Sequence, residues 1–98
     1  MLELNKIIHE RSRLLILIHL ISNKDKEISF NDIRNKLKFT SGNLSIQLKK
    51  LSEADYIKIR KSYRDNKPYT AVIITPKGIK SFNSYLEEME DLIKGLKE

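Results

Sequence analysis

The segment FTSGNLSIQLKKL, residues 39–51, decides how the rest of the chain is interpreted. Its leucines at 44, 48 and 51 recur at helical spacing, so they predict a helix with one face in the protein core. Ile46 falls on the opposite face, among small polar residues and just ahead of two lysines. That face is a candidate binding surface, because it carries an isoleucine that cannot point to the same core.

The residues just before this helix predict a small strand and a second short helix. ISF at residues 28–30 is short enough for a small strand. SFND at residues 29–32 has the pattern of a helix start, with a serine cap and an acid three residues later. A tight connection then leads to a cap at Thr40 or Ser41. Residues 29–54 therefore read as a helix-turn-helix.

Beyond residue 55 the apolar pattern changes from a helical period to a period of two. YIKIRKSY (56–63) alternates, and YTAVIIT (69–75) is rich in β-branched residues, so the two predict a hairpin over 56–75 with RDNKP as its tip. Threonine followed by proline at 75–76 starts a last helix over 76–97. Its apolar residues form a heptad seam at Phe82, Leu86, Met89, Ile93 and Leu96.

The N-terminal segment, residues 1–22, predicts two helices. Apolar residues from Leu4 onward recur at helical intervals, and the charged stretch 11–13 indicates a break between a short leading helix and a longer one. The run LLILIHLI (14–21) is too short for a bilayer span, which needs about 20 apolar residues. We interpret it as a buried helix and expect no membrane partner.

Charge and composition restrict the classes of function. The chain has 98 residues and a net charge of +6, and the whole excess lies in residues 34–67, with ten basic and three acidic side chains. Such a concentration indicates a polyanionic partner, nucleic acid before anionic membrane, although a merely lysine-rich soluble surface is the alternative. The absence of cysteine excludes disulfides and thiolate metal sites and fits a cytoplasmic location.

No catalytic constellation is recognisable, so we expect a protein that is not an enzyme and has no cofactor or metal site. No serine has a recognisable base partner. His9 and His19 are ten residues apart without an acidic cluster beside them. His19 lies in the apolar run and is interpreted as a hydrogen-bonded core residue.

The order of the elements is that of a winged helix-turn-helix, and three segments carry a family resemblance. RSRLLILIHLI (11–21), ISFNDIRNKLKFTSGNLSIQLKKLSEADYIKIRKSY (28–63) and VIITPKGIKSFNSYLEEME (72–90) resemble the small winged-helix transcriptional regulators of the MarR and ArsR groups. GNLSIQLKKLSEADYI followed by ITPKG is the most specific part. The expected fold is α+β and mostly α, one domain over residues 1–98 with a long C-terminal dimerisation helix.

Two positions depart from the family pattern. Asp55 stands where relatives usually have glycine before the tyrosine that opens the wing, and aspartate tolerates turn conformations, so we expect the turn to be kept. Ile46 and Gln47 stand where relatives often have histidine or arginine, which bears on the DNA sequence that is read. Metal-sensing ArsR relatives need clustered cysteine or histidine, and this sequence has no such cluster.

The residue types of the central helix suit the major groove of DNA. Small leading residues can enter the groove, asparagine can pair with adenine, and an exposed isoleucine can cover thymine methyl groups. The predicted recognition-helix contacts are Thr40, Ser41, Gly42, Asn43, Ser45, Ile46, Lys49 and Lys50. Those of the wing and its flanks are Lys36, Lys38, Arg60, Lys61, Arg64 and Lys67, with Arg64 at the tip. Each of these residues also has an alternative interpretation. Ile46 can be an isolated surface residue or can contact the preceding helix or a partner, and Asn43 can be an ordinary polar residue of the first turn. Thr40 and Ser41 can act as helix caps, and the basic hairpin tip can be a solvated turn.

The terminal helix has a wide apolar stripe with acidic residues opposite, which predicts a two-fold dimer. The predicted dimer contacts are Leu4, Ile7, Ile8, Phe82, Tyr85, Leu86, Met89, Leu92, Ile93 and Leu96. The alternative is that this helix folds back on its own core. A dimer would place two recognition helices about 34 Å apart and would require a pseudo-palindromic site.

Together these patterns predict a homodimeric transcriptional regulator, a repressor by preference, that binds double-stranded DNA sequence-specifically. The competing interpretation is a winged-helix protein-protein interaction module within a larger transcription or regulatory assembly. A small-molecule effector is compatible with the first interpretation, in a pocket between the dimer helices and the DNA-binding lobe, but the sequence names no ligand.

Overall fold

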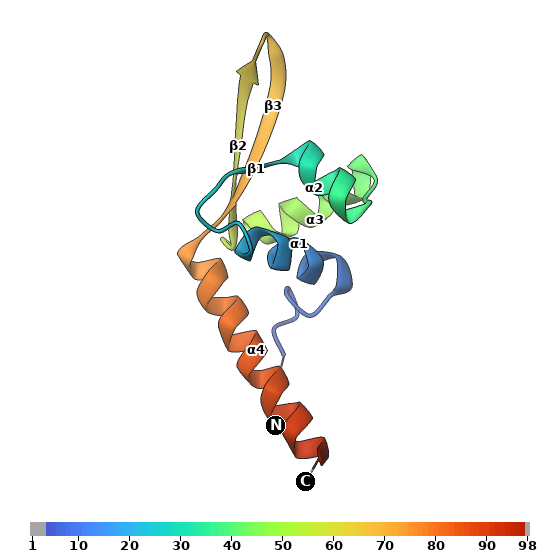
Figure 1. Cartoon of the computed structure of the whole chain (residues 1–98), viewed down its shortest axis with the longest axis vertical. Coiled ribbons are helices and arrows are strands. Elements are labelled where there is room, and N and C mark those ends of the chain that lie inside the picture. The colour runs from blue at the N-terminus through green and yellow to red at the C-terminus, as the bar shows by residue number, and fades with distance from the viewer. Residues whose placement is uncertain (1–3, 98) are drawn as a thin grey trace.

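The computed structural model describes residues 4–97, in which four helices and three strands form an elongated molecule (Figure 1). In chain order the elements are α1 (Arg11–Ile21), β1 (Ile28–Ser29), α2 (Phe30–Leu37), α3 (Ser41–Glu53), β2 (Ile57–Arg64), β3 (Lys67–Ile74) and α4 (Pro76–Lys97). Helices α1 to α3 form the body, the β2–β3 hairpin extends from one end and α4 from the other (Figure 1). The predicted winged helix-turn-helix fold is confirmed.

The sheet is antiparallel, with strand order β1-β3-β2. Strand β1 pairs Ile28 with Val72, and the hairpin register runs from Ile57 opposite Ile74 to Arg64 opposite Lys67. Both strands therefore extend closer to the tip than the sequence indicated, and the loop between them has two residues instead of the predicted five. Asp65 and Asn66 have φ of 51° and 62°, values that these residue types adopt readily in a tight hairpin turn.

The core is a single cluster to which all four helices and the hairpin contribute. The three leucines of α3 are almost fully buried, as their spacing predicted. Helix α1 lies at the centre of the body and buries Ile16, Leu17 and Leu20, which fits its apolar sequence. The apolar side of α3 is thereby fixed against the body, and its other side is left on the surface.

Side-chain caps set where the helices begin. Ser29 Oγ accepts from Asp32 N (3.0 Å) and Thr40 Oγ1 accepts from Asn43 N (3.1 Å), which confirms the predicted caps of α2 and α3. Glu10 caps α1, a role that the sequence did not indicate. Burial tends to raise the pKa of Glu10, but hydrogen bonds from the Arg13 and Ser12 amides and the positive charges of Arg13 and Lys50 outweigh it and hold that pKa below its ordinary value.

The junction between hairpin and terminal helix is built from the ITPKG segment. Asp55 has φ of 63°, so it keeps the left-handed turn for which relatives use glycine, as expected. Thr75 Oγ1 donates to Asp55 O (2.6 Å) and accepts from Gly78 N (3.0 Å), which caps α4 against that turn. A Cβ atom on Gly78 would lie 2.2 Å from Tyr56 O, so only glycine allows this close approach.

The predicted leading helix is wrong. Residues 6–10 form turns instead, and the first helix begins at Arg11. The physical reason is local. The Asn5 side chain accepts from the amides of Ile7 (2.9 Å) and Ile8 (3.2 Å) as a helix cap does, but the backbone of Glu10 is extended, with φ of −151° and ψ of 132°, so the helical turn that Asn5 begins cannot continue into α1. Glu10 then starts α1 as its cap.

The predicted dimer set also needs correction. Ile8, Phe82 and Tyr85 belong to the core of the single chain and are almost fully buried there, so they offer no surface to a second copy. The first half of α4 packs beside the N-terminal segment, where His9 Nδ1 lies 2.8 Å from Tyr85 Oη. The alternative weighed for the terminal helix, packing on its own core, holds for this half.

Candidate nucleic-acid interface

The outward side of α3 forms an exposed surface of small, apolar and basic residues. Ile46 is 55% exposed, so it lies on the surface and not in the core. The other exposed residues of this face are Ser41, Gly42, Asn43, Ser45, Lys49 and Lys50, and at the end of the helix the acidic Glu53. The structure therefore brings together the predicted recognition-helix set on one side of one helix, adjacent to the Thr40 cap.

The first turn of α3 is ordered by side-chain hydrogen bonds. Ser41 Oγ accepts from Arg34 Nη1 (3.1 Å), and Asn43 Oδ1 accepts from Gln47 Nε2 (3.1 Å). Thr40 is committed to capping through its oxygen. The amides at this helix start and the positive end of the helix dipole favour an anion such as a phosphate.

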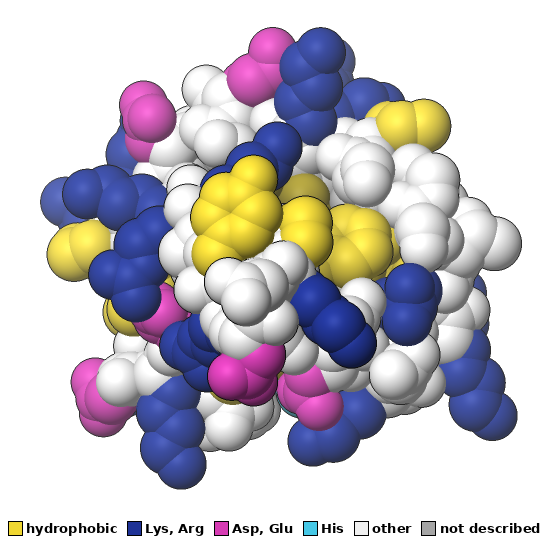
Figure 2. All heavy atoms as spheres, turned by 90° about the horizontal axis from the view of Figure 1, so that it is seen from above, with side chains coloured by type: hydrophobic (Ala, Val, Ile, Leu, Met, Phe, Trp, Pro, Cys, Tyr) yellow, Lys and Arg dark blue, Asp and Glu magenta, His cyan; other side chains and the backbone are white. Residues whose placement is uncertain are grey.

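The hairpin presents basic side chains around a pair of tyrosines. Tyr63 is 76% exposed, and the Arg64 guanidinium lies 3.9 Å from the centre of the Tyr69 ring, a cation-π contact that holds the predicted tip residue beside the hairpin. Lys61 and Lys67 are exposed. Seen from the hairpin end, lysine and arginine side chains surround a central apolar group (Figure 2).

Two of the predicted basic contacts are already engaged within the chain. Arg60 forms an ion pair with Glu27, and Lys36 Nζ lies 3.6 Å from Asp32 Oδ1. Both basic side chains remain well exposed, so each pair is a weak surface interaction. Their charge is nevertheless partly neutralised, which lowers what they can contribute to binding a polyanion.

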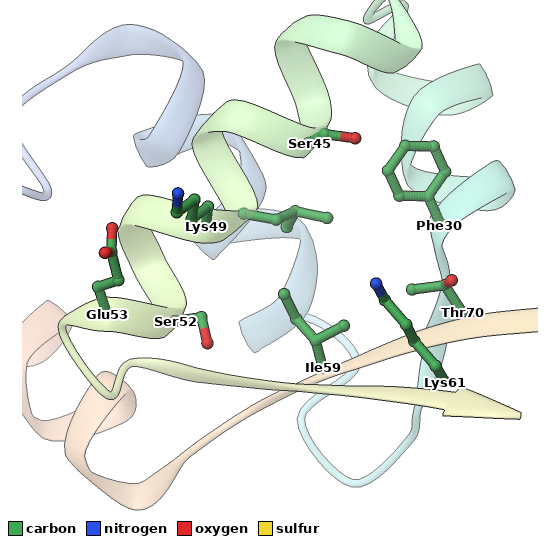
Figure 3. Close-up of a pocket in the computed structure, with 9 residues that line it drawn as sticks. Phe30, Ser45, Lys49, Ser52, Glu53, Ile59, Lys61 and Thr70 are labelled. Carbon is green, nitrogen blue, oxygen red and sulfur yellow. The ribbon is translucent and has the colours of Figure 1, made fainter.

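A groove of about 480 Å³ separates α3 from the hairpin (Figure 3). Its apolar lining comes from Phe30, Leu48 and Ile59, and Lys61 extends across it from β2 toward α3, while Ser45 faces it from the helix (Figure 3). The groove thus lies between the outward face of α3 and the hairpin, and residues of both elements line it. Its polar lining includes the predicted contacts Ser45, Lys49 and Lys61. Sequence reasoning did not find the apolar lining, because Phe30 and Ile59 come together only through packing between segments far apart in the chain.

A buried arginine behind α3 was also missed. Arg13 is only 8% exposed and donates from Nε to Ile7 O (2.6 Å) and from Nη1 to Gln47 Oε1 (2.7 Å). It therefore joins the N-terminal segment, α1 and α3. The sequence does place Arg13 directly before the apolar run 14–21, and an arginine buried there would need hydrogen-bonding partners.

The two histidines do not form a site. His9 bonds to Tyr85 as described above, and His19 is mostly buried with Nε2 3.4 Å from Asp32 Oδ2, outside hydrogen-bond geometry. The prediction of a hydrogen-bonded His19 is therefore not borne out. Within residues 4–97 there is no cluster of histidine, cysteine or acidic side chains suited to a metal ion, and no helix is long and apolar enough to span a bilayer.

Comparison with known proteins identifies winged-helix relatives. The sequence model of the winged helix DNA-binding domain family matches residues 12–93. A transcriptional regulator homologue from Pyrococcus horikoshii has a similar structure, with a TM-score of 0.84 and 30% identity over 92% of this chain and 87% of that one. An uncharacterized protein from Methanocaldococcus jannaschii is 37% identical over 67 residues, 68% of this chain and 73% of that protein.

A more distant structure shows the same fold in the presence of nucleic acid. The MepR-DNA complex of S. aureus is similar with a TM-score of 0.74 and 17% identity, over 94% of this chain and 73% of that one. At that identity the likeness concerns the fold alone. The predicted resemblance to small winged-helix transcriptional regulators is confirmed.

Proposed function

Because the chain belongs to the winged helix DNA-binding domain family, we propose that it regulates transcription by binding double-stranded DNA with the outward face of α3. The observation that carries this proposal is the exposure of Ile46 and Asn43 side by side on a helix whose opposite side is locked into the core. An exposed apolar side chain between small polar ones matches the surface of a major groove, where thymine methyl groups adjoin hydrogen-bonding base edges.

Each residue of the face has a distinct proposed task. Asn43, Ser45 and Ile46 contact base edges, because they lie on the early turns of the helix and are short enough to approach them. Lys49 and Lys50 lie further along the helix and contact phosphates. Base contacts provide sequence preference, whereas phosphate contacts provide affinity that depends on salt.

The hairpin and the turn before α3 supply further phosphate contacts. Lys38, Lys61, Arg64 and Lys67 are exposed and form no ion pair within the described residues. Arg64 is the proposed tip contact, and its stacking on Tyr69 keeps it extended from the strand. Lys36 and Arg60 are weaker flanking contacts, since each must share its charge with an acidic neighbour.

We also propose that the protein acts as a homodimer through the second half of α4. This half extends away from the body, and it exposes Leu86, Leu92, Ile93 and Leu96 (Figure 1). Leu4, Ile7 and Met89 are packed against the core but only partly buried, and the proposed contact includes them. A two-fold pair would bind a pseudo-palindromic site, with half-sites about 34 Å apart. Occupying a promoter site in the cytoplasm would then repress transcription.

Selection of bound fragments from a random-sequence duplex library, followed by footprinting, tests this function. We expect an enriched pseudo-palindrome whose half-sites are one helical turn apart. Asn43→Ala and Ile46→Ala are expected to relax the base preference, whereas Lys49→Ala should weaken all sequences about equally. A library that enriches nothing, together with a stoichiometric protein partner in a pull-down, would support the protein-interaction module instead.

A further inference from the structure

The buried side chain of Arg13 connects two parts of the chain that the fold could have left independent. Its guanidinium donates to Ile7 O at 2.6 Å and to Gln47 Oε1 at 2.7 Å, and the Glu10 carboxylate lies 3.6 Å away. A buried charge is stable only where it is paired and hydrogen-bonded, so these partners fix the position of the Arg13 guanidinium. Arg13 therefore holds Gln47 on the inner edge of α3 in a fixed place.

The chemistry of the guanidinium also fixes which way the Gln47 amide points. A guanidinium carries hydrogen-bond donors and no acceptor, so the Gln47 atom that faces it must be the carbonyl oxygen. The Gln47 amide nitrogen is then directed away from Arg13, toward Asn43 Oδ1 at 3.1 Å. The order of donors and acceptors runs in one direction, from the buried charge to the surface.

This order determines what Asn43 presents to a ligand. Because its carbonyl oxygen accepts from Gln47, one lone pair of Oδ1 is used, and the Asn43 amide is held so that Nδ2, with its two N–H donors, is turned away from Gln47. Asn43 is exposed on the outward face of α3. In the major groove, acceptors are offered by the purine N7 atoms, guanine O6 and thymine O4, whereas cytosine offers a donor.

We propose that Arg13 and Gln47 form a relay that sets the amide of Asn43, so that its N–H donors face the DNA and select a base with an acceptor. This relay rests on the proposed function and adds to it a rule for the base that Asn43 reads. Arg13 and Gln47 are positioning residues, because neither needs to touch DNA. Without the relay, the Asn43 amide can turn over and accept from cytosine as readily as it donates.

The first test uses the wild-type chain and the duplex selected from a random library. The base pair that Asn43 contacts is the one whose preference is lost in Asn43→Ala. Because every base pair offers an acceptor in the major groove, base analogues that lack purine N7, guanine O6 or thymine O4 replace that base pair in turn. The relay requires that the loss of one of these acceptors weaken binding by the wild type and not by Asn43→Ala. Equal effects on both proteins at every acceptor would overturn it.

The second test compares base ratios between variants on the selected duplex and its single-base substitutions. Gln47→Glu can still accept from Arg13 but cannot donate to Asn43, so the preference at that base pair should fall about tenfold, the scale of one good base contact. Lys50→Gln is the matched control, since it changes the charge of α3 equally and leaves the relay intact. It should lower affinity for all duplexes and keep the ratio.

The outcomes separate the relay from the function on which it rests. A wild-type chain that enriches no sequence would overturn both. An enriched site whose Asn43 position keeps its preference in Gln47→Glu would overturn the relay alone, provided that thermal melting shows the variant folded. If Gln47→Glu does not fold, the acceptor substitutions of the first test decide.

Discussion

Replacing Lys49 by glutamine should flatten the salt dependence of DNA binding without changing which sequence is preferred. Lys49 lies on the exposed side of α3 and borders the groove between that helix and the hairpin. If its ammonium neutralises a phosphate, binding releases a condensed counterion, and that release disappears in the variant.

The size of the effect follows from the basic residues that the structure leaves available. Six of the proposed contacts are exposed and form no ion pair among the described residues, namely Lys38, Lys49, Lys50, Lys61, Arg64 and Lys67. With one phosphate each, the slope of log affinity against log salt is about −5 per protomer, and removing one contact reduces it by about 0.9. Between 50 and 200 mM salt, the variant should therefore lose about 3.5-fold less affinity per protomer than the wild-type chain.

Fluorescence anisotropy of a labelled duplex, titrated at several sodium chloride concentrations, measures this slope. Lys97→Gln is the control, because it removes the same charge from the last turn of α4, at the opposite end from the hairpin (Figure 1). At these salt concentrations, the interaction of Lys97 with DNA bound at the hairpin end is screened, so the salt slope of Lys97→Gln should equal that of the wild type. Equal slopes for Lys49→Gln and the wild type would refute the placement of this lysine on a phosphate.

Three further predictions concern the fold and the assembly. Thr75→Val should lower the free energy of unfolding by about 2–4 kcal/mol in urea denaturation, because it leaves a buried N–H and a carbonyl unpaired, whereas Thr75→Ser should stay close to wild type. Ile93→Glu with Leu96→Glu should yield monomers in analytical ultracentrifugation, and an unchanged dimer would place the interface elsewhere. The depressed pKa of Glu10 means that its ionised form stabilises the fold at pH values above the ordinary carboxylate pKa, and this stabilisation is lost as the pH falls through the depressed pKa. The difference in unfolding free energy between the wild type and Glu10→Gln should therefore shrink in acid. A difference that stays constant with pH would contradict a role for the negative charge in capping.

Most of the secondary structure could be predicted because its signals are local. Serine and threonine caps, the threonine-proline start of α4 and the period of two in the hairpin each depend on a few neighbouring residues. The leading helix was mispredicted for the same reason. Apolar spacing suggested a helix there, but the extended backbone of Glu10, which caps α1, ends the turn that Asn5 begins, and the periodicity of apolar residues does not register such a break.

Features that depend on long-range packing could not be predicted. The heptad seam of α4 does not distinguish Phe82, which packs on its own core, from Leu96, which is 87% exposed. Arg13 and Gln47 are 34 residues apart, and only the packing of α1 against α3 brings them within hydrogen-bond distance. The outward face of α3 was predicted in full, because a single helix fixes which residues share a side.

A double-mutant cycle between Ile46 and thymine methyl groups tests the role of the α3 face most directly. The selected duplex is made with uracil in place of each thymine in turn, and affinities are measured for the wild type and for Ile46→Ala. We expect one thymine per half-site at which losing the methyl group costs the wild type about fourfold, from about 0.8 kcal/mol per methyl-sized group removed from water, and costs the variant almost nothing. Equal losses for both proteins at every thymine would show that the isoleucine of α3 does not lie in the groove.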